Sequence, residues 1–435
     1  MKFFLPDSQD LVDPSFDFET EQRNGLRIRQ RDDLYAHELF REQPYDGLLV
    51  SMGIVHGFGS VGGRYSIGQR NRLLRVGVRE FFRLSKIAGY KLSVMGDCGA
   101  FTYVDEKVPP YTVDEVLNFY DDCGFDMGVS VDHVILDYDP ELDRPKAAAP
   151  RELRDRQSLT LELALQFRKE HRARGCTFEP LGVAQGWSPR SYANSVRQLQ
   201  KMGYRYVALG GMVPLKSNDI LTCLEAVNAI RRSETRLHLL GVTRTEHVQT
   251  FERCGVVSFD STTPLRQAFK DDRDNYYSPA GNYVAIRVPQ VDGNLALERR
   301  IAAGAVHQRE ALQLEAAALD ALRMRSQRRI SVANAVDRLI EYEELCLPAE
   351  PSDSIRPGKV SRREKQLRQH REDYTRALTD EPWRTCGCEV CKTIGHHVIL
   401  FRGAERNRRR GMHNVWTFYR HNVRRVPGRT ATAAA

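Results

Sequence analysis

The sequence predicts an α/β fold, a TIM-type (β/α)8 barrel followed by a C-terminal structural zinc-binding appendage. Short apolar runs alternate with segments long enough for a helix and two turns. Such runs are typical of parallel strands buried on both faces, and parallel neighbours need crossover helices. Several runs end at a polar or glycine residue, and in a parallel barrel these strand ends converge on one mouth, where catalysis occurs. A cluster of three cysteines near the C-terminus predicts the appendage.

Seven strands can be placed along the chain, and an eighth is needed to close the barrel. The first is expected at 47–55, and a late one at 237–242. Between and after them, five further runs lead to Asp97, Asp132, Gln185, Gly210 and Asp260. Residues 1–45 are polar and mixed with no clear period, so the sequence does not place the eighth strand.

Helical spacing of apolar residues separates these runs. Helices are expected at 69–84, 112–123, 159–172, 188–202 and 219–231. The second carries a capping box, because Glu115 follows Thr112 by three residues. The Gly-rich stretch 57–63 lacks the Lys-Ser/Thr pair of a P-loop, so we expect a flexible loop over the mouth.

The pattern changes after the last of these strands. A strand-like piece at 283–289 precedes a stretch at 294–345 whose helical spacing predicts two helices. The prolines of 348–354 end that stretch. The predicted domains are a catalytic barrel at 1–290, a helical segment at 291–350 and a basic zinc-binding subdomain with a tail at 351–430.

The composition supports a folded chain and narrows its location. The 435 residues are 41% hydrophobic, enough for a barrel and an appendage. Apolar runs are only a handful of residues long, so no transmembrane helix is expected. The N-terminus turns acidic too soon for a signal peptide, and six of the nine cysteines are scattered singly. These features predict a cytoplasmic protein with no membrane partner.

Basic residues are concentrated near the C-terminus. The net charge is +8, and nine arginines lie between Arg402 and Arg429 against the lone acidic residue Glu405. A second basic stretch spans 356–371, and aromatic residues are interleaved with the arginines at Trp416, Phe418 and Tyr419. This pattern predicts a phosphate-binding face for nucleic acid, and the alternative is a solvated tail.

Asp97 and Asp260 are the candidate catalytic pair. Two carboxylates at one barrel mouth suit a double displacement at a sugar carbon, in which one attacks and the other moves a proton. Phe101 follows Asp97 closely and could stack on a base. A single strand-terminal aspartate can also cap the next helix, but the recurrence of such residues together with Gln185 favours a site.

Asp132 and Gln185 offer hydrogen bonds that complement guanine. A carboxylate accepts from the N1–H and exocyclic amine of such a base, and an amide donates to its carbonyl oxygen. Gly210 and Gly211 let backbone N–H groups approach a flat ligand. His133, beside Asp132, is expected to be packed or hydrogen-bonded.

The most specific local motif in the sequence is a cluster of three cysteines, Cys386, Cys388 and Cys391. Three thiolates this close in a cytoplasmic chain predict a zinc site, and tetrahedral zinc needs a fourth ligand. The candidates for that ligand are His396, His397 and His413. Four protein ligands would close the site, so its role would be structural.

These residues resemble the motifs of the tRNA-guanine transglycosylase family, in unbroken order from about residue 47 to 414. The matching segments are Asp97-Cys98-Gly99-Ala100-Phe101-Thr102, Asp132, Ala184-Gln185-Gly186, Leu209 to Leu215, His238-Leu239-Leu240-Gly241-Val242, Phe259-Asp260, the three clustered cysteines and His413-Asn414. The resemblance selects His413 as the fourth zinc ligand.

The resemblance implies a base exchange on nucleic acid. Asp260 would attack C1′, guanine would leave and a 7-deazaguanine would enter, with Asp97 as general acid and base. The base would be held by Asp132, Gln185, Gly210 and Gly211. The resemblance also implies structural Zn²⁺ and, as is frequent in the family, a homodimer formed through the zinc region.

Departures from the family pattern bear on the substrate. Bacterial tRNA enzymes carry an acidic residue after the Gly-Gly segment, suited to an aminomethyl cation. Here residues 212–216 read Met-Val-Pro-Leu-Lys, so the neutral nitrile base preQ0 is the expected incoming substrate. Ala100 and Thr102 replace a Gly and a Gln of the first motif, which alters the base contacts expected there.

Residues 3–10, together with residues 96–101 and 130–133, are similar to the DNA-modifying branch of the family, the 7-deazaguanine DNA transglycosylases. This implies double-stranded DNA and preQ0 as substrates, with a companion ATPase and a preQ0-processing enzyme. A short basic tail after His413, in place of the archaeal RNA-binding domains, agrees with that branch. The alternatives are an archaeal-type tRNA-guanine transglycosylase and a non-catalytic nucleic-acid-binding subunit, and the presence of both Asp97 and Asp260 argues against the latter.

Overall fold

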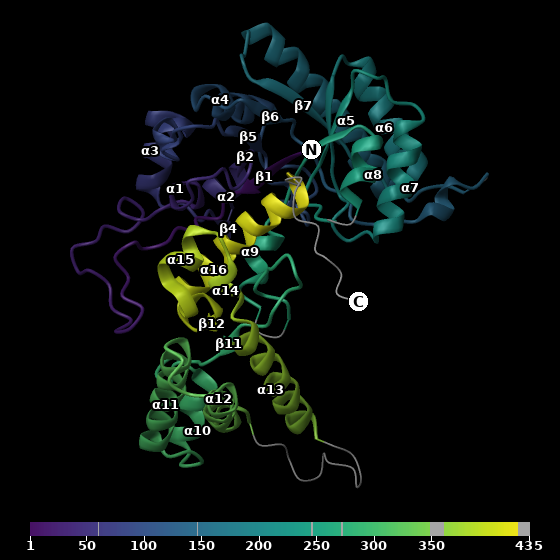
Figure 1. Ribbon diagram of the computed structural model, residues 1–435. Coiled ribbons are helices and arrows are strands. Elements are labelled where there is room, and N and C mark those ends of the chain that lie inside the picture. The colour runs from purple at the N-terminus through teal and green to yellow at the C-terminus, as the bar shows by residue number, and fades with distance from the viewer. Residues whose placement is uncertain (60, 146, 245–246, 271–272, 349–360, 425–435) are drawn as a thin grey trace. The chain divides into compact units, whose positions relative to one another are not determined.

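Eight parallel strands close a barrel, and the predicted fold class is confirmed. The computed structural model describes residues 1–435 except 60, 146, 245–246, 271–272, 349–360 and 425–435. The strands are β1 (Lys2–Pro6), β2 (Gly47–Ser51), β5 (Ser93–Asp97), β6 (Met127–Val129), β7 (Glu179–Ala184), β8 (Tyr206–Leu209), β9 (Arg236–Leu239) and β10 (Val256–Asp260) (Figure 1). They follow the chain around the ring, and β1 closes it by pairing with both β10 and β2.

The eighth strand is the N-terminal segment β1, which the sequence pattern did not place. Phe3, Phe4 and Leu5 are buried, and Phe4 pairs with Gly47 on one side and Asp260 on the other. Three apolar residues between polar neighbours are too short a run to reveal a strand period. Because it pairs with β10, this strand helps to fix the position of Asp260 in the barrel.

Alternating side chains from the strands form one interior cluster. Its members are Phe4, Leu49, Met95, Met127, Val129, Leu181, Val183, Tyr206 and Ala208, none more than 9% exposed. The barrel is therefore a packed core and not a pore, so a ligand can reach only its ends.

Helices connect the strands and lie around them (Figure 1). They are α2 (Met52–His56), α3 (Ile67–Phe81), α4 (Val113–Asp122), α5 (Arg151–Arg174), α6 (Pro189–Lys201), α7 (Ser217–Asn228) and α8 (Val248–Arg253), with short 3₁₀ turns at Leu84–Lys86, Ala100–Tyr103 and Pro140–Asp143, whereas α9 (Thr263–Gln267) follows the last barrel strand in the sequence. The predicted cap of α4 is confirmed, since the Thr112 hydroxyl accepts from the Glu115 amide at 3.2 Å. Ser66 and Ser188 cap α3 and α6 in the same way.

Some element boundaries differ from the sequence expectation. The strand predicted at 47–55 ends at Ser51, and the apolar run continues as α2 because that helix is also mostly buried. Helix α5 begins at Arg151 and not at 159, since its first turns carry mainly exposed polar side chains that show no apolar period. The Gly-rich stretch forms a hairpin of β3 (Gly57–Phe58) and β4 (Val61–Gly62).

A second compact unit comprises, among the described residues, 11–42 and 264–418, while the barrel unit holds 1–10, 43–263 and the last turn at Tyr419–Val423. Its elements are α1 (Ala36–Leu39), α10 (Leu295–Ala302), α11 (Gln308–Ser326), α12 (Val332–Cys346), α13 (Arg362–Asp380), α14 (Pro382–Thr385), α15 (Glu389–Ile394), the 3₁₀ turn Gly395–Ile399 and α16 (Gly403–Phe418), with β11 (Ile286–Arg287) parallel to β12 (Leu400–Phe401). Helices α11, α12 and α13 pack in succession.

Three helices occupy the stretch 294–345, where the sequence pattern predicts two. Gly304 separates α10 from α11 and adopts a left-handed backbone conformation (φ 73°), which other residues rarely take. The predicted domain boundaries at 290 and 350 remain predictions. The two compact units are defined by packing alone, whereas a domain must also be able to fold by itself. The part of the predicted tail beyond residue 424 lies outside the described residues.

Four of the five arginines between residues 402 and 410 are buried, so they do not form the exposed phosphate-binding face that the sequence predicts. Arg402, Arg406, Arg409 and Arg410 are all at most 6% exposed. Arg402 pairs with Glu21 and Glu315, while Arg410 donates to backbone carbonyls and to Asn407. The acidic partners lie far away in the sequence, so the local charge run conceals the pairing.

The aromatic residues interleaved with those arginines, Trp416, Phe418 and Tyr419, are buried as well. The basic C-terminal helix is therefore an internal element of its unit. No helix in the described part of the chain combines the length and the apolar character needed to cross a membrane.

Candidate active site

The predicted site residues lie at or just after the carboxyl ends of barrel strands. Asp97 ends β5 and Asp260 ends β10, while Gln185 directly follows β7 and Asp132 lies three residues beyond β6. The carboxyl ends of parallel strands share one end of a barrel. All four side chains therefore belong to the same mouth, as the sequence predicts.

Asp97 is electrostatically coupled to two other acids. Burial raises the pKa of Asp97 to about 7, and the nearby charges of Asp132 and Asp260 add to the effect. The amide of Gly99 opposes the rise by donating to Oδ2 at 2.9 Å. A carboxyl group with a pKa near neutrality can both give and take a proton, which is the requirement for a general acid and base.

Replacing Asp97 with asparagine should stabilise the fold at alkaline pH. A folded-state pKa raised from 3.8 to about 7 means that ionisation of Asp97 opposes folding, with a cost that grows between these values and is complete above them. We expect Asp97→Asn to unfold at a higher temperature than the wild type at pH 8 and at the same temperature near pH 4. Thermal unfolding followed by circular dichroism at both pH values checks this, and an equal effect at both would contradict it.

Asp260 is held through one of its two oxygens. Its Oδ1 accepts from His238 Nε2 at 3.1 Å and from the Gly241 amide at 3.0 Å. The carboxylate is 6% exposed and the histidine is fully buried. Both donors are on or just after β9, the strand beside β10, so strand pairing places them.

Asp132 and Gln185 are bonded to each other. Gln185 Nε2 donates to Asp132 Oδ2 at 2.6 Å, and its Oε1 accepts from the Ile135 amide at 3.1 Å. The Cys98 thiol donates to Asp132 Oδ1 at 3.2 Å. Burial raises the pKa of Asp132, while the bonds from Cys98 and Gln185 oppose that rise. A base that binds here must exchange some of these contacts for its own.

Gly210 and Gly211 lie directly against Gln185. A Cβ atom on Gly210 would come within 2.3 Å of Gln185 Nε2, and one on Gly211 within 2.1 Å of the Ile135 carbonyl oxygen. Gly211 also has a positive φ of 72°. Glycine at these two positions therefore lets the Gln185 side chain and the Ile135 carbonyl pack directly against the backbone.

Phe101 is half exposed, at 50%, in the turn that follows β5. Its neighbour Tyr103 is buried and donates to the Cys98 sulfur at 3.1 Å and to the Asp132 carbonyl at 3.2 Å. The exposed ring is thus available for stacking, while the buried one supports the site. His133 is buried, as expected, with its amide bonded to the Thr160 hydroxyl.

Sequence reasoning assigned no role to the residues that support these carboxylates. They are His238, Ser258, Tyr206, Cys98 and Tyr103. His238 and Cys98 belong to motifs visible in the sequence, but their contacts depend on strand register, which motif spacing does not give.

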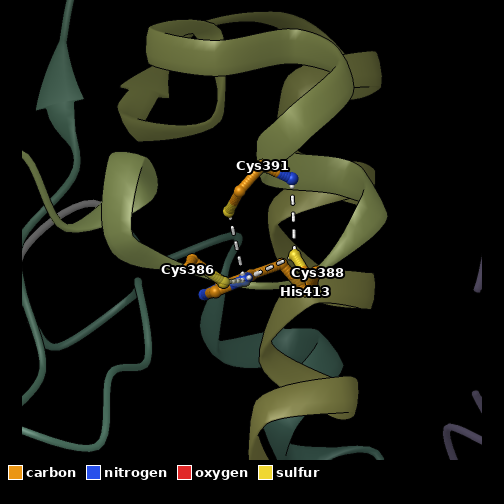
Figure 2. A group of neighbouring side chains, drawn as sticks. All are labelled: Cys386, Cys388, Cys391 and His413. Atoms are coloured by element: carbon orange, nitrogen blue, oxygen red, sulfur yellow. Dashed lines mark hydrogen bonds between the residues drawn. The ribbon is translucent and has the colours of Figure 1, made fainter.

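The cysteine cluster is a candidate metal centre (Figure 2). His413 Nδ1 lies 3.6 Å from Cys386 Sγ and 3.4 Å from both Cys388 Sγ and Cys391 Sγ. Tetrahedral zinc with Zn–S of about 2.3 Å and Zn–N of about 2.05 Å needs S···N separations of about 3.6 Å. The donor set and its spacing therefore fit a four-coordinate metal ion.

The surroundings orient His413 as a ligand. Its Nε2 donates to the Tyr277 carbonyl at 2.8 Å, which leaves Nδ1 free to face the sulfurs. The ring stacks on Tyr276 with centroids 4.2 Å apart. The other two candidates, His396 and His397, group with Glu19 and not with the cysteines. The structure thus brings His413 to the cluster.

A closed parallel barrel with acidic side chains gathered at the carboxyl ends of its strands defines a barrel enzyme. No protein-family model matches the chain. The chain is 46% identical over 420 residues to a DNA-guanine transglycosylase of Salmonella montevideo, and the match covers 96% of each protein. The chain belongs to the DNA-guanine transglycosylase family, and it is an enzyme of the base-exchanging pentosyltransferase class.

Proposed function

We propose that this enzyme exchanges guanine in double-stranded DNA for preQ0 by double displacement. The observation that carries the proposal is that Asp97 ends β5 and Asp260 ends β10 at one barrel mouth, and the raised pKa of Asp97 agrees with it. Two carboxylates on one glycosidic bond, one attacking and one moving a proton, suffice for base exchange with retained configuration. The match to a DNA-guanine transglycosylase supports DNA as the substrate.

The first displacement uses Asp260 as the nucleophile. Its carboxylate attacks C1′ of the target nucleotide, and the electron pair of the C1′–N9 bond passes to guanine. Asp97 gives the departing base a proton, for which its raised pKa suits it. The product is a deoxyribosyl ester of Asp260, with guanine released.

The second displacement runs the same steps in the opposite direction. The incoming preQ0 loses its N9 proton to Asp97, and N9 attacks C1′. The ester bond to Asp260 breaks, and its electron pair returns to the carboxylate. Asp97 is then protonated again, so the enzyme is restored without any further reactant.

Base recognition falls to Asp132, Gln185 and the backbone at Gly210 and Gly211, with Phe101 stacking on a base. The Gly210 amide itself donates to the Ala184 carbonyl at 3.1 Å, so Gly210 contributes close approach and not a donor. The lining after Gly211 supports preQ0 as the entering base. Met212 is buried and Val213 is 42% exposed, and residues 212–216 include no carboxylate that could pair with a cationic side chain. A neutral nitrile fits such a lining better than an aminomethyl cation does.

We assign Zn²⁺ to Cys386, Cys388, Cys391 and His413. Zinc bound by four protein ligands has no open position, so it would cross-link the chain segments that carry these ligands. It would thereby tie α15 to α16 within the second unit.

The proposal also includes the partners of the enzyme and its location in the cell. Exposed basic side chains on α13, Arg362 and Lys365, are candidates for phosphate contacts. None of the nine cysteines, all within the described residues, forms a disulfide, which supports a cytoplasmic location. A companion ATPase, a preQ0-processing enzyme and a homodimer are proposed on the family resemblance.

Nucleoside analysis tests the exchange. The protein is incubated with plasmid DNA and preQ0, and in parallel with tRNA and preQ0, and both nucleic acids are digested to nucleosides. We expect the deazaguanine deoxynucleoside in the DNA digest and no deazaguanine nucleoside in the tRNA digest. A deazaguanine nucleoside in tRNA alone would replace the proposal with the tRNA alternative. Its absence from both digests would favour a non-catalytic subunit.

The first displacement should weaken as the pH rises through about 7. The acid form of Asp97 is required for guanine to leave, and this form is lost above the raised pKa of about 7. We therefore expect kcat/KM for DNA to decrease as the pH rises above about 7. Asp97→Asn should lower kcat/KM about 10²- to 10⁴-fold and abolish this alkaline decrease. Guanine release from DNA, measured from pH 5.5 to 9, checks this, and an unchanged alkaline decrease in Asp97→Asn would assign the proton to another group.

A further inference from the structure

A chain of buried hydrogen bonds runs from β8 through β10 to the candidate nucleophile. Tyr206 is bonded to Ser258, whose hydroxyl lies 2.6 Å from His238 Nδ1, and His238 Nε2 lies 3.1 Å from Asp260 Oδ1. None of the four residues is more than 6% exposed. The rings of Phe4 and His238 pack in a T-shaped arrangement with their centroids 6.0 Å apart, which restricts rotation of the His238 ring.

With Asp260 ionised as a nucleophile and His238 in its neutral form, the direction of each of these hydrogen bonds follows. An ionised carboxylate can only accept, so His238 Nε2 must carry the hydrogen that it shares with Asp260. In the neutral ring Nδ1 is then an acceptor, so Ser258 donates to it, and Tyr206 donates to Ser258. The chain thus holds the one tautomer that can support the nucleophile.

We propose that His238 is a positioning residue for the nucleophile, holding Oδ1 of Asp260 together with the Gly241 amide so that Oδ2 attacks C1′. This inference rests on the proposed function. The reason is that both donors engage the same oxygen, which leaves the other oxygen to form the ester.

The same two donors favour release of the sugar in the second displacement. Hydrogen bonds to an ionised acceptor are stronger than bonds to a neutral one, so they stabilise the carboxylate more than the ester carbonyl. Without the His238 donor, the equilibrium between the free Asp260 carboxylate and its deoxyribosyl ester shifts towards the ester. A loss of positioning therefore predicts slower turnover together with more covalent adduct, whereas a loss of folding predicts less of both.

The test compares turnover with trapped adduct in matched variants. Exchange is measured with plasmid DNA and preQ0, and adduct is measured after denaturing the enzyme with DNA and no preQ0. We expect His238→Phe to lower kcat about 10²-fold, as loss of one oxyanion donor does, and to raise the trapped fraction above that of the wild type. His238→Gln, whose amide can still donate to Asp260, should recover most of kcat.

Two further variants keep the test decisive. Ser258→Ala should lower kcat by a smaller factor in the same direction, and it serves if His238→Phe does not fold. His171, buried in the same unit and bonded to the Phe178 carbonyl at 2.8 Å, is the matched control, and His171→Phe should leave exchange unchanged. A trapped fraction that falls in parallel with kcat, or no recovery in His238→Gln, would overturn the inference. Absence of adduct in the wild type would instead refute the proposed function.

Discussion

Replacing Asp260 with asparagine should abolish base exchange while leaving the fold intact. The amide is close in shape to the carboxylate, and its oxygen can still accept from His238 and Gly241, whose donors lie 3.1 and 3.0 Å away in the wild type. It cannot act as an anionic nucleophile, so neither the ester nor the second displacement can occur. We expect exchange to fall at least about 10⁴-fold, as removal of a nucleophile commonly does.

Incorporation of preQ0 into plasmid DNA measures this effect, and circular dichroism confirms the fold. Asp114→Asn is the matched control, because Asp114 is an exposed aspartate of the same unit that pairs with Arg174 on the surface. Its exchange should equal that of the wild type. An Asp260→Asn variant that still forms a covalent adduct with DNA would show that another residue is the nucleophile.

Replacing Cys388 with serine should release the bound metal and destabilise the protein. Cys388 is fully buried, caps α15 and shares the cluster with His413. Serine lacks the thiolate that zinc prefers, and structural zinc contributes directly to folding free energy. We expect loss of stoichiometric zinc and a fall in Tm of about 10 °C or more.

Metal content by mass spectrometry and thermal unfolding together check this prediction. The control is Cys346→Ser, which changes a cysteine of the same unit outside the cluster and should retain one zinc per chain. A Cys388→Ser variant that keeps its zinc would refute the site. A variant that loses zinc without any loss of stability would refute its structural role.

The sequence predicted the barrel well because its strands are buried on both faces. A continuous apolar run marks such a strand without any knowledge of its partners, as at β8, where all four residues are buried. β1 was missed because its apolar stretch is short, and its place depends on pairing with β10, 256 residues away in the register Lys2↔Ser258. The local periodicity of apolar residues carries no information about long-range strand pairing of that kind.

The candidate site could be predicted from the sequence only in part. Asp97, Asp132, Gln185 and Asp260 were predicted because strand ends share one mouth whatever the register. The contact of His238 with Asp260 could not be predicted, since it depends on how β9 and β10 pair, and that pairing includes a shift between Val256 and Ser258.

Charge was the least reliable guide. Nine arginines near the C-terminus predicted an exposed binding face, yet Arg410 is fully buried and donates to three carbonyl groups of the backbone. Arg409 likewise meets Glu405 and the Asp13 carbonyl inside the unit. A run of like charges predicts solvent exposure only when no partner is supplied from elsewhere in the chain.

Mapping the covalent adduct identifies the nucleophile. The wild-type enzyme is mixed with plasmid DNA in the absence of preQ0, denatured, and digested with nuclease and protease, and the modified peptide is identified by mass spectrometry. We expect a deoxyribosyl group on Asp260, with one guanine released for each modified chain. A sugar attached to any other residue, or guanine released without an adduct, would contradict it.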